Sequence, residues 1–197
     1  MSASINKSSA LALSELFVSA RGAKSCALTL GGHKHIVTLG SRSDLLTTPF
    51  GASSFGDDAT TRKTIEFWLA QNSIWLAYFD TIDAWAIPYI ALNSERLFKK
   101  TLTDDQVREI YKPIVQRKGT YPATVRCKIN VAGGGAVRCW NAMDHRVSVP
   151  EYLRAVELLP RVHISHLWIM NRDCGFLLNV LDLQCVEAST ACPFMQE

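Results

Sequence analysis

Basic residues gather between residues 96 and 138, and this clustering is the clearest chemical signal in the sequence. The 197-residue chain has a formal net charge of +3. Ten Lys and Arg residues and three acidic residues lie in this segment, which therefore carries +7 and leaves −4 for the remainder. A local field of one sign favours an anionic partner such as RNA, although a solvated surface would show the same pattern.

Non-specific RNA binding needs cations that replace counterions and aromatic rings on which bases can stack. We predict no readout of particular bases. Packing in the core or at an interface is the alternative role for the tryptophan of this set. The predicted RNA-binding residues are Lys99, Lys100, Arg117, Lys118, Arg126, Lys128, Arg138 and Trp140.

The segment Tyr121–Ala142 is predicted to present the last four of these residues on a β-hairpin. Two alternating runs flank Gly133–Gly135, and glycines supply the positive φ angles of a tight turn. A three-residue loop would place Val131 opposite Val137 on an apolar face. Lys128 and the Trp140 indole would then face each other on the opposite, basic side. The other pairs on this mainly apolar face are Ile129 with Cys139 and Cys127 with Asn141.

Other candidate chemistry has less support, and we predict no catalytic site, no cofactor and no metal. No GxSxG motif or P-loop is present. Two histidines near Cys26 lack a fourth zinc ligand with suitable spacing. Two acidic pairs could bind calcium between subunits or serve as helix caps and turns. These groups are His33 with His35, Asp57 with Asp58, and Asp80 with Asp83.

The hydrophobic periodicity predicts eight strands with helices in their connections. The strands are predicted at 25–30, 35–39, 74–79, 84–92, 123–131, 136–142, 162–170 and 176–187. Helices are predicted from Ser8 or Ser9 to Gly22, from Asp58 or Thr60 to Asn72, after the capping box at Thr103–Gln106, and from Ser148 to Pro160.

This order indicates a mainly β protein, an eight-stranded antiparallel jelly-roll sandwich, because no βαβ alternation is present. An α+β fold with a smaller sheet is the alternative. The predicted organisation is an N-terminal arm at 1–23, one sandwich domain at 24–190 and a C-terminal tail at 191–197. Acidic residues interrupt the most apolar region, so no membrane span is expected. Without an export signal, a cytosolic location and free, buried cysteines are expected.

The architecture resembles the coat proteins of small positive-strand RNA viruses. The resemblance rests on the arm, the eight strands with helices after the second and fourth, and the long apolar final strand FLLNVLDLQCVEA. It implies a capsid protein that assembles with itself into a shell, packages RNA, and is found in the virion and the host cytoplasm. Many such coats have an Arg/Lys-rich arm, whereas here the arm is nearly neutral.

Three functions therefore remain open from the sequence. The main prediction is a self-assembling capsid protein that is not an enzyme. The alternative is a cytosolic RNA-binding protein that uses the same basic face without assembling. An enzyme whose site is built from distant residues is the third.

Overall fold

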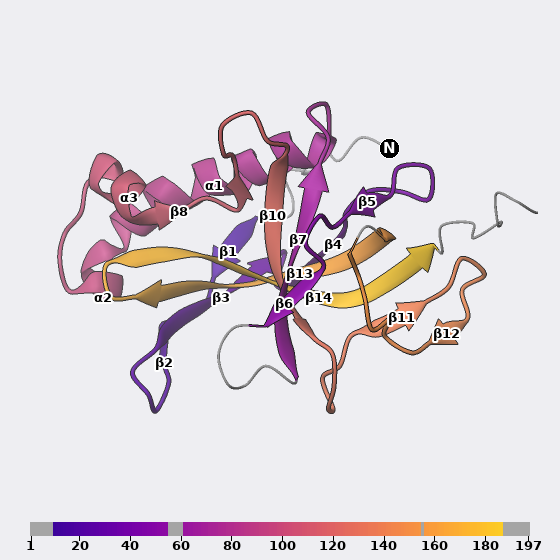
Figure 1. Cartoon of the computed structure of the whole chain (residues 1–197). Coiled ribbons are helices and arrows are strands. Elements are labelled where there is room, and N and C mark those ends of the chain that lie inside the picture. Colours follow the sequence, from indigo (N-terminus) through magenta and orange to yellow (C-terminus); the bar gives the residue numbers. More distant parts are fainter. Residues whose placement is uncertain (1–9, 55–60, 155, 187–197) are drawn as a thin grey trace, which may run out of the picture. The chain divides into compact units, whose positions relative to one another are not determined.

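The computed structural model describes residues 10–54, 61–154 and 156–186. The chain divides into two compact units: unit 1 comprises residues 1–37, 69–126 and 163–179, and unit 2 comprises 38–68, 127–162 and 180–197. The protein is mainly β, with a large mixed sheet and a few short helices in the described part (Figure 1). The predicted tail at 191–197 lies outside the described residues.

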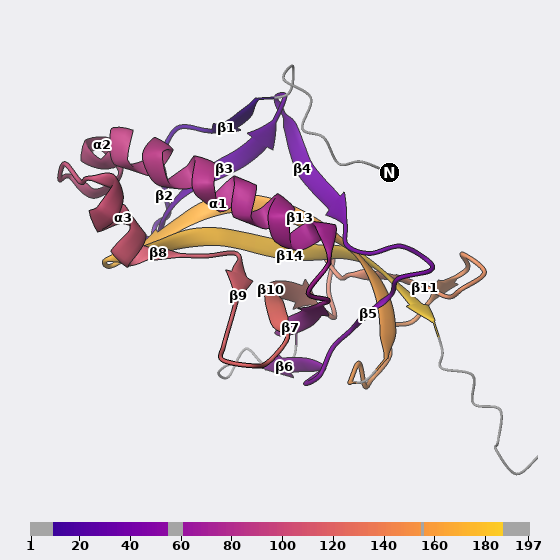
Figure 2. The same ribbon diagram turned by 90° about the horizontal axis from the view of Figure 1, so that it is seen from above.

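Unit 1 contains all three helices of the described chain and several strands. Helix α1 lies beside α2 and α3, as Figure 2 shows from above. The elements of unit 1 are β1 (Leu11–Leu13), β2 (Phe17–Val18), β3 (Lys24–Leu30), most of β4 (His33–Thr38), α1 (Ile74–Leu92), α2 (Ser94–Phe98), α3 (Asp104–Ile110), β8 (Tyr111–Lys112) and β9 (Val115–Gln116).

Unit 2 is built from strands, and it shares three long strands with unit 1 along the chain. Its own elements are β5 (Leu46–Thr47), β6 (Ala52–Ser54), most of β7 (Arg62–Leu69), β11 (Arg138–Trp140) and β12 (Arg146–Val147). The strands that continue from one unit into the other are β10 (Ala123–Asn130), β13 (Glu157–Met170) and β14 (Asp173–Val186).

Strand pairing is both antiparallel and parallel. The main hydrogen-bonded order is β1-β3-β4-β13-β14-β10-β7-β6. In unit 1, β8 pairs parallel with β14, and in unit 2, β11 does the same. A jelly-roll sandwich with only antiparallel pairs is therefore not confirmed. The α+β alternative fits less well than a mainly β description.

The segment 74–92, predicted as two strands, forms the single helix α1, so that prediction is wrong. The buried residues of α1 recur at helical spacing, namely Phe79, Ile82, Asp83, Ala86 and Ile90. The Ser73 hydroxyl caps the helix by accepting a hydrogen bond from the Trp75 N–H at 3.3 Å. The β-branched and aromatic residues that suggested strands pack equally well on the buried face of a helix.

The acidic residues at 80 and 83, predicted as a turn, instead join α1 to its neighbours in unit 1. Asp80 receives two hydrogen bonds from Arg117, at 2.8 and 3.0 Å. Asp83 is buried, and its carboxylate accepts the Tyr111 hydroxyl at 2.5 Å and the Ile114 N–H at 3.1 Å. Burial raises the pKa of Asp83 to about 6, although both hydrogen bonds act in the opposite direction.

Three of the predicted helices are also wrong. Residues predicted as the second helix form β7, in which Ile65, Phe67 and Leu69 are buried with a period of two. The predicted arm helix is replaced over its described part by β1 and β2, which both pair with β3. Residues 148–154 form no helix. The last residues of that predicted helix belong instead to β13, which begins at Glu157 and continues through Pro160.

Several predictions are confirmed. The strands β3 and β4 form the expected antiparallel hairpin around two glycines with positive φ. Thr103 and Gln106 make both hydrogen bonds of the capping box at α3. The strands predicted at 162–170 and 176–187 are β13 and β14, although both begin earlier than expected. The five described cysteines are free and buried.

Candidate nucleic-acid interface

Asp182 is the centre of a polar cluster in unit 2. Arg138 lies directly across from Asp182 in the parallel pairing of β11 with β14. Its Nε lies 2.7 Å from one carboxylate oxygen, and a terminal nitrogen donates to the other at 2.8 Å. Trp140 donates its indole N–H to the same carboxylate at 3.3 Å, and Arg161 donates at 3.4 Å. One buried carboxylate therefore holds two guanidinium groups and an indole.

A second carboxylate, Asp144, holds the other side of this cluster. Arg42 donates to both of its oxygens, at 2.6 and 2.7 Å. The Gln184 amide donates to Asp144 at 2.8 Å and to the Asn141 carbonyl at 3.1 Å, which ties the turn after β11 to β14. The hydrogen bond from Arg42 lowers the pKa of Asp144 below its usual value.

The cluster lines an open hollow of about 430 Å³. Three arginines and two aspartates give it a net charge of +1, and the half-buried Trp140 lines it beside them. Arg146 lies over this ring, 5.8 Å from its centre, in a cation–π contact. The residues that line the hollow are Thr38, Arg42, Arg138, Trp140, Asp144, Leu159, Arg161, Asp182 and Gln184.

The protonation state of Asp182 suits its role as the shared hydrogen-bond acceptor of this cluster. Burial alone would raise its pKa, but hydrogen bonds from Arg138 and Trp140 and the charges of Arg138 and Arg161 outweigh burial and lower it. Asp182 is therefore ionised at neutral pH and orients both arginines. Each guanidinium has five N–H donors, so Arg138 retains donors that could bind phosphate.

The structure brings together only two of the predicted site residues, Arg138 and Trp140. The predicted hairpin register is wrong, because β11 pairs with β12 and β14. One hydrogen bond joins the two predicted strands near the turn, from the Val137 N–H to the Asn130 carbonyl at 2.8 Å. The Lys128 ammonium, predicted to face the indole across that hairpin, donates to the Thr64 hydroxyl at 2.9 Å.

The burial pattern of β10 is nevertheless the expected one. Val125, Cys127 and Ile129 are buried, whereas Arg126 is exposed and Lys128 is half-buried between them. The apolar and basic faces of this strand were therefore predicted correctly from its alternation.

The remaining predicted residues lie in unit 1. Arg117 is paired with Asp80 at 2.8 Å, and Lys118 follows β9 on the exposed surface. Lys99 ends α2 with a positive φ of 60°, and both Lys99 and Lys100 are exposed. Lys100 lines a separate hollow beside Phe98 and Arg172.

Five members of the unit 2 cluster were missed, namely Arg42, Asp144, Arg161, Asp182 and Gln184. The final strand carried a usable signal, because Asp182 and Gln184 interrupt an apolar run on one face of β14. A buried carboxylate needs a cationic or hydrogen-bonding partner. Arg42 and Arg161 offered no comparable local pattern.

Other candidate chemistry receives no support in the described residues. No group of three or more His, Cys, Asp and Glu side chains that could hold a metal ion occurs there. The pair Asp57 and Asp58 lies outside the described residues. Over the same described part, none of the helices is long and apolar enough to span a membrane.

Comparison with solved structures gives a similar fold for most of the chain. The single-stranded DNA-binding protein gp2.5 of bacteriophage T7 matches with a TM-score of 0.53 and 13% identity, over 83% of this chain and 98% of that one. The single-stranded DNA-binding protein of bacteriophage Enc34 matches with a TM-score of 0.42 and 8% identity, over 90% of this chain and 87% of that one; this score is too low to support a conclusion. No protein-family model and no curated protein matches the sequence.

The match to the T7 protein overturns the predicted resemblance to viral coat proteins. The structural likeness is to a phage single-stranded DNA-binding protein, not to a capsid protein. The predictions of a capsid, of self-assembly into a shell and of a place in a virion depended on that resemblance and are wrong. The alternative prediction, a cytosolic RNA-binding protein that does not assemble, agrees better with this likeness in binding nucleic acid, although the T7 protein binds single-stranded DNA.

Proposed function

We propose that the chain binds single-stranded nucleic acid without assembling into a shell, through the hollow around Trp140. The observation that carries this proposal is the shared anchoring of Arg138 and Trp140 on Asp182. It fixes an aromatic plane and a guanidinium group side by side at an open surface. The fold supports the same conclusion, because the similar T7 protein is a single-stranded DNA-binding protein.

The chemistry of the hollow suits single strands. An unpaired base presents a π-face that can stack on an indole, and arginines beside it can bind the flanking phosphates. In a duplex the bases are stacked on each other and cannot reach Trp140 without unpairing. The hollow offers cations for phosphates and a ring for base faces, neither of which depends on the identity of the base, so binding should depend little on sequence.

Fluorescence anisotropy with labelled oligonucleotides tests this proposal. Single strands of DNA and RNA, each about 20 nucleotides long, are compared with a duplex of the same length at salt concentrations from about 50 to 200 mM. We expect tighter binding to single strands, weakening steeply with salt. Light scattering of the free protein should give a monomer or dimer of the 21.9 kDa chain. Absence of single-strand binding, or preference for the duplex, would contradict the proposal.

The DNA and RNA arms are both needed because the sequence pattern suggested RNA, whereas the similar T7 protein binds DNA. That the chain is not an enzyme, and that it acts in the cytoplasm, stay predictions.

A further inference from the structure

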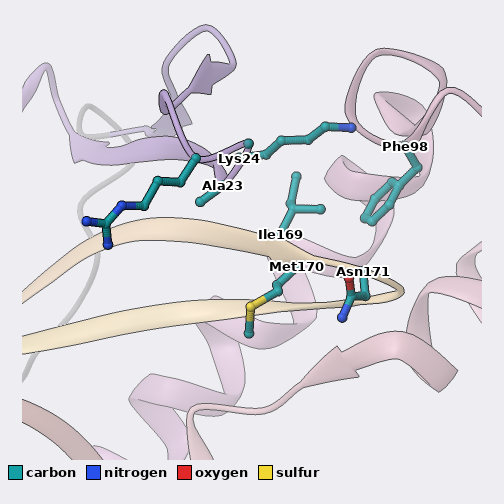
Figure 3. Close-up of a pocket in the computed structure, with 8 residues that line it drawn as sticks. Ala23, Lys24, Phe98, Ile169, Met170 and Asn171 are labelled. Carbon is teal, nitrogen blue, oxygen red and sulfur yellow. The ribbon is translucent and has the colours of Figure 1, made fainter. Parts of the chain in front are cut away.

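Unit 1 contains two hollows that share Phe98 and Asn171. The first has a volume of about 400 Å³ and lies between the turn before β3 and the end of β13 (Figure 3). The second, of about 520 Å³, lies between the residues after α2, helix α3 and the turn after β13. Besides the shared residues, Arg21, Lys24, Ile169 and Met170 line the first, and Lys100, Leu102, Gln106 and Arg172 are among those that line the second.

The charge of this surface differs from that of the unit 2 hollow. Arg21, Lys24, Lys100 and Arg172 line the two hollows against one acidic residue, Glu109. None of these four cations forms an ion pair with any residue that the structure describes, whereas Arg138 and Arg161 share Asp182. Cations without a carboxylate partner keep their mobile counterions in solution, and releasing those counterions to a phosphate backbone favours binding.

An aromatic ring lies among these cations. Phe98 is half-buried at the end of α2, and the Lys24 side chain extends from β3 toward it (Figure 3). The Lys24 ammonium donates to the carbonyl of Leu97, the residue before Phe98, at 3.4 Å. Met170 adds exposed apolar surface, with 64% of its surface accessible.

The backbone at this surface is already paired. In β3, Lys24 lies opposite Val18 of β2 on one side and Ile169 of β13 on the other. An extended peptide could not add there as a new strand, because β3 has no free edge at that position. Recognition must therefore depend on the side chains, which offer a ring and cations. That combination suits bases and phosphates better than a peptide backbone.

We infer that the two Phe98 hollows form a second contact for single-stranded nucleic acid, separate from the Trp140 hollow. A base stacks on Phe98, and Lys100 and Arg172 bind phosphates on the side of α3. This inference rests on the proposed function, and it assigns a second group of residues to the binding of single-stranded nucleic acid.

Photochemical cross-linking can test each contact by itself. The full chain is bound to a thymidine oligonucleotide in which single positions carry 5-iodouracil, irradiated, and digested for mass spectrometry. We expect cross-links on a peptide containing Phe98 and on a peptide containing Trp140. Cross-links at Trp140 alone would overturn the inference and leave the proposed function intact, whereas cross-links at neither would contradict both.

A charge variant provides a second test that does not touch the half-buried ring. Lys100→Ala with Arg172→Ala removes two exposed cations, so the slope of log affinity against log salt should fall in magnitude by about 1.4. The control, Lys34→Ala with Arg62→Ala, removes two exposed charges that line none of these hollows and should change the slope less. Equal slopes for the two double variants would overturn the inference.

An acidic partner protein is the competing occupant. Decaglutamate is therefore added as a competitor to the complex of the wild-type chain with the oligonucleotide, and cross-linking at Phe98 is measured again. We expect the cross-link to persist at a peptide concentration that matches the oligonucleotide in charge. Loss of the Phe98 cross-link at that concentration would overturn the inference and indicate an acidic protein partner.

Discussion

The carboxylate of Asp182 binds Arg138 and the Trp140 indole at once, 2.7 Å from the Arg138 Nε and 3.3 Å from the indole nitrogen. Arg138 and Trp140 are two positions apart on β11, so they point to the same side of the strand. The acidic residue on β14 thus sets the direction of both groups that the proposed function needs.

Replacing Asp182 should disturb both stability and binding. We expect Asp182→Asn to lower the free energy of unfolding by about 1–3 kcal/mol, because charge-assisted hydrogen bonds to a buried group are lost. Single-strand affinity should fall as well, since Arg138 and Trp140 are no longer fixed. Urea unfolding and anisotropy measure the two effects. Asp105→Asn is the matched control, because Asp105 forms an exposed ion pair with Arg108 at 3.8 Å. It should change neither the free energy of unfolding nor the single-strand affinity.

The same residue predicts a pH effect. Because the pKa of Asp182 is lowered in the folded chain, its stabilising contribution is present above the unfolded pKa of about 3.9 and is lost as pH falls through the lower folded value. The difference in stability between wild type and Asp182→Asn should therefore shrink on acidification below about pH 4. A difference that stays constant over that range would show that ionised Asp182 is not its source.

Asp83 should produce the opposite pH dependence in unit 1. Burial raises its pKa to about 6, so the folded chain holds this proton more tightly than the unfolded chain. The resulting stabilisation is full below about pH 3.9 and is lost as pH rises through about 6, a change of about 3 kcal/mol. Unfolding by urea at several pH values should show a flatter profile for Asp83→Asn than for wild type. Asp105→Asn, at an exposed position of α3, should retain the wild-type slope.

Arg117 should contribute little to nucleic-acid binding although the sequence places it in the basic segment. It already pairs with Asp80, and both side chains are about half exposed. We expect Arg117→Ala to change the free energy of unfolding by no more than about 1 kcal/mol. Its effect on the salt dependence of binding should be smaller than that of Lys100→Ala. An equal or larger effect would show that the Asp80 pair opens to bind phosphate.

The strands with strict alternation could be predicted from the sequence. In β10, buried Val125, Cys127 and Ile129 alternate with polar residues, and alternation likewise identified β3. The cap at Thr103 was equally local, since both of its hydrogen bonds lie within four residues. Such features depend on neighbours in the sequence and need no knowledge of tertiary contacts.

The errors occurred where tertiary partners decide the structure. Residues 74–92 have the composition of strands, yet burial of Phe79, Ile82 and Ile90 on one face stabilises a helix. Thr64 and Lys63 belong to β7 because β6 pairs with that strand, a partner that no local pattern revealed.

The candidate site was predicted only in part for the same reason. Arg138 and Trp140 could be found from their alternation on one strand. Their position beside Asp182 depends on a parallel pairing between segments that are about forty residues apart. The glycine-rich turn suggested a hairpin with the preceding strand instead, which hid that partner.

The most direct test of the proposed function is the affinity of Trp140→Ala for a labelled single strand. We predict a loss of roughly 5- to 150-fold relative to wild type, the equivalent of about 1–3 kcal/mol for one stacked base. Trp140→Phe should retain part of the affinity, because it keeps a ring but loses the hydrogen bond to Asp182. Tyr152→Ala removes an exposed aromatic side chain outside the hollow and should bind like wild type. Wild-type affinity in a folded Trp140→Ala variant would contradict the assignment of this hollow as the binding site.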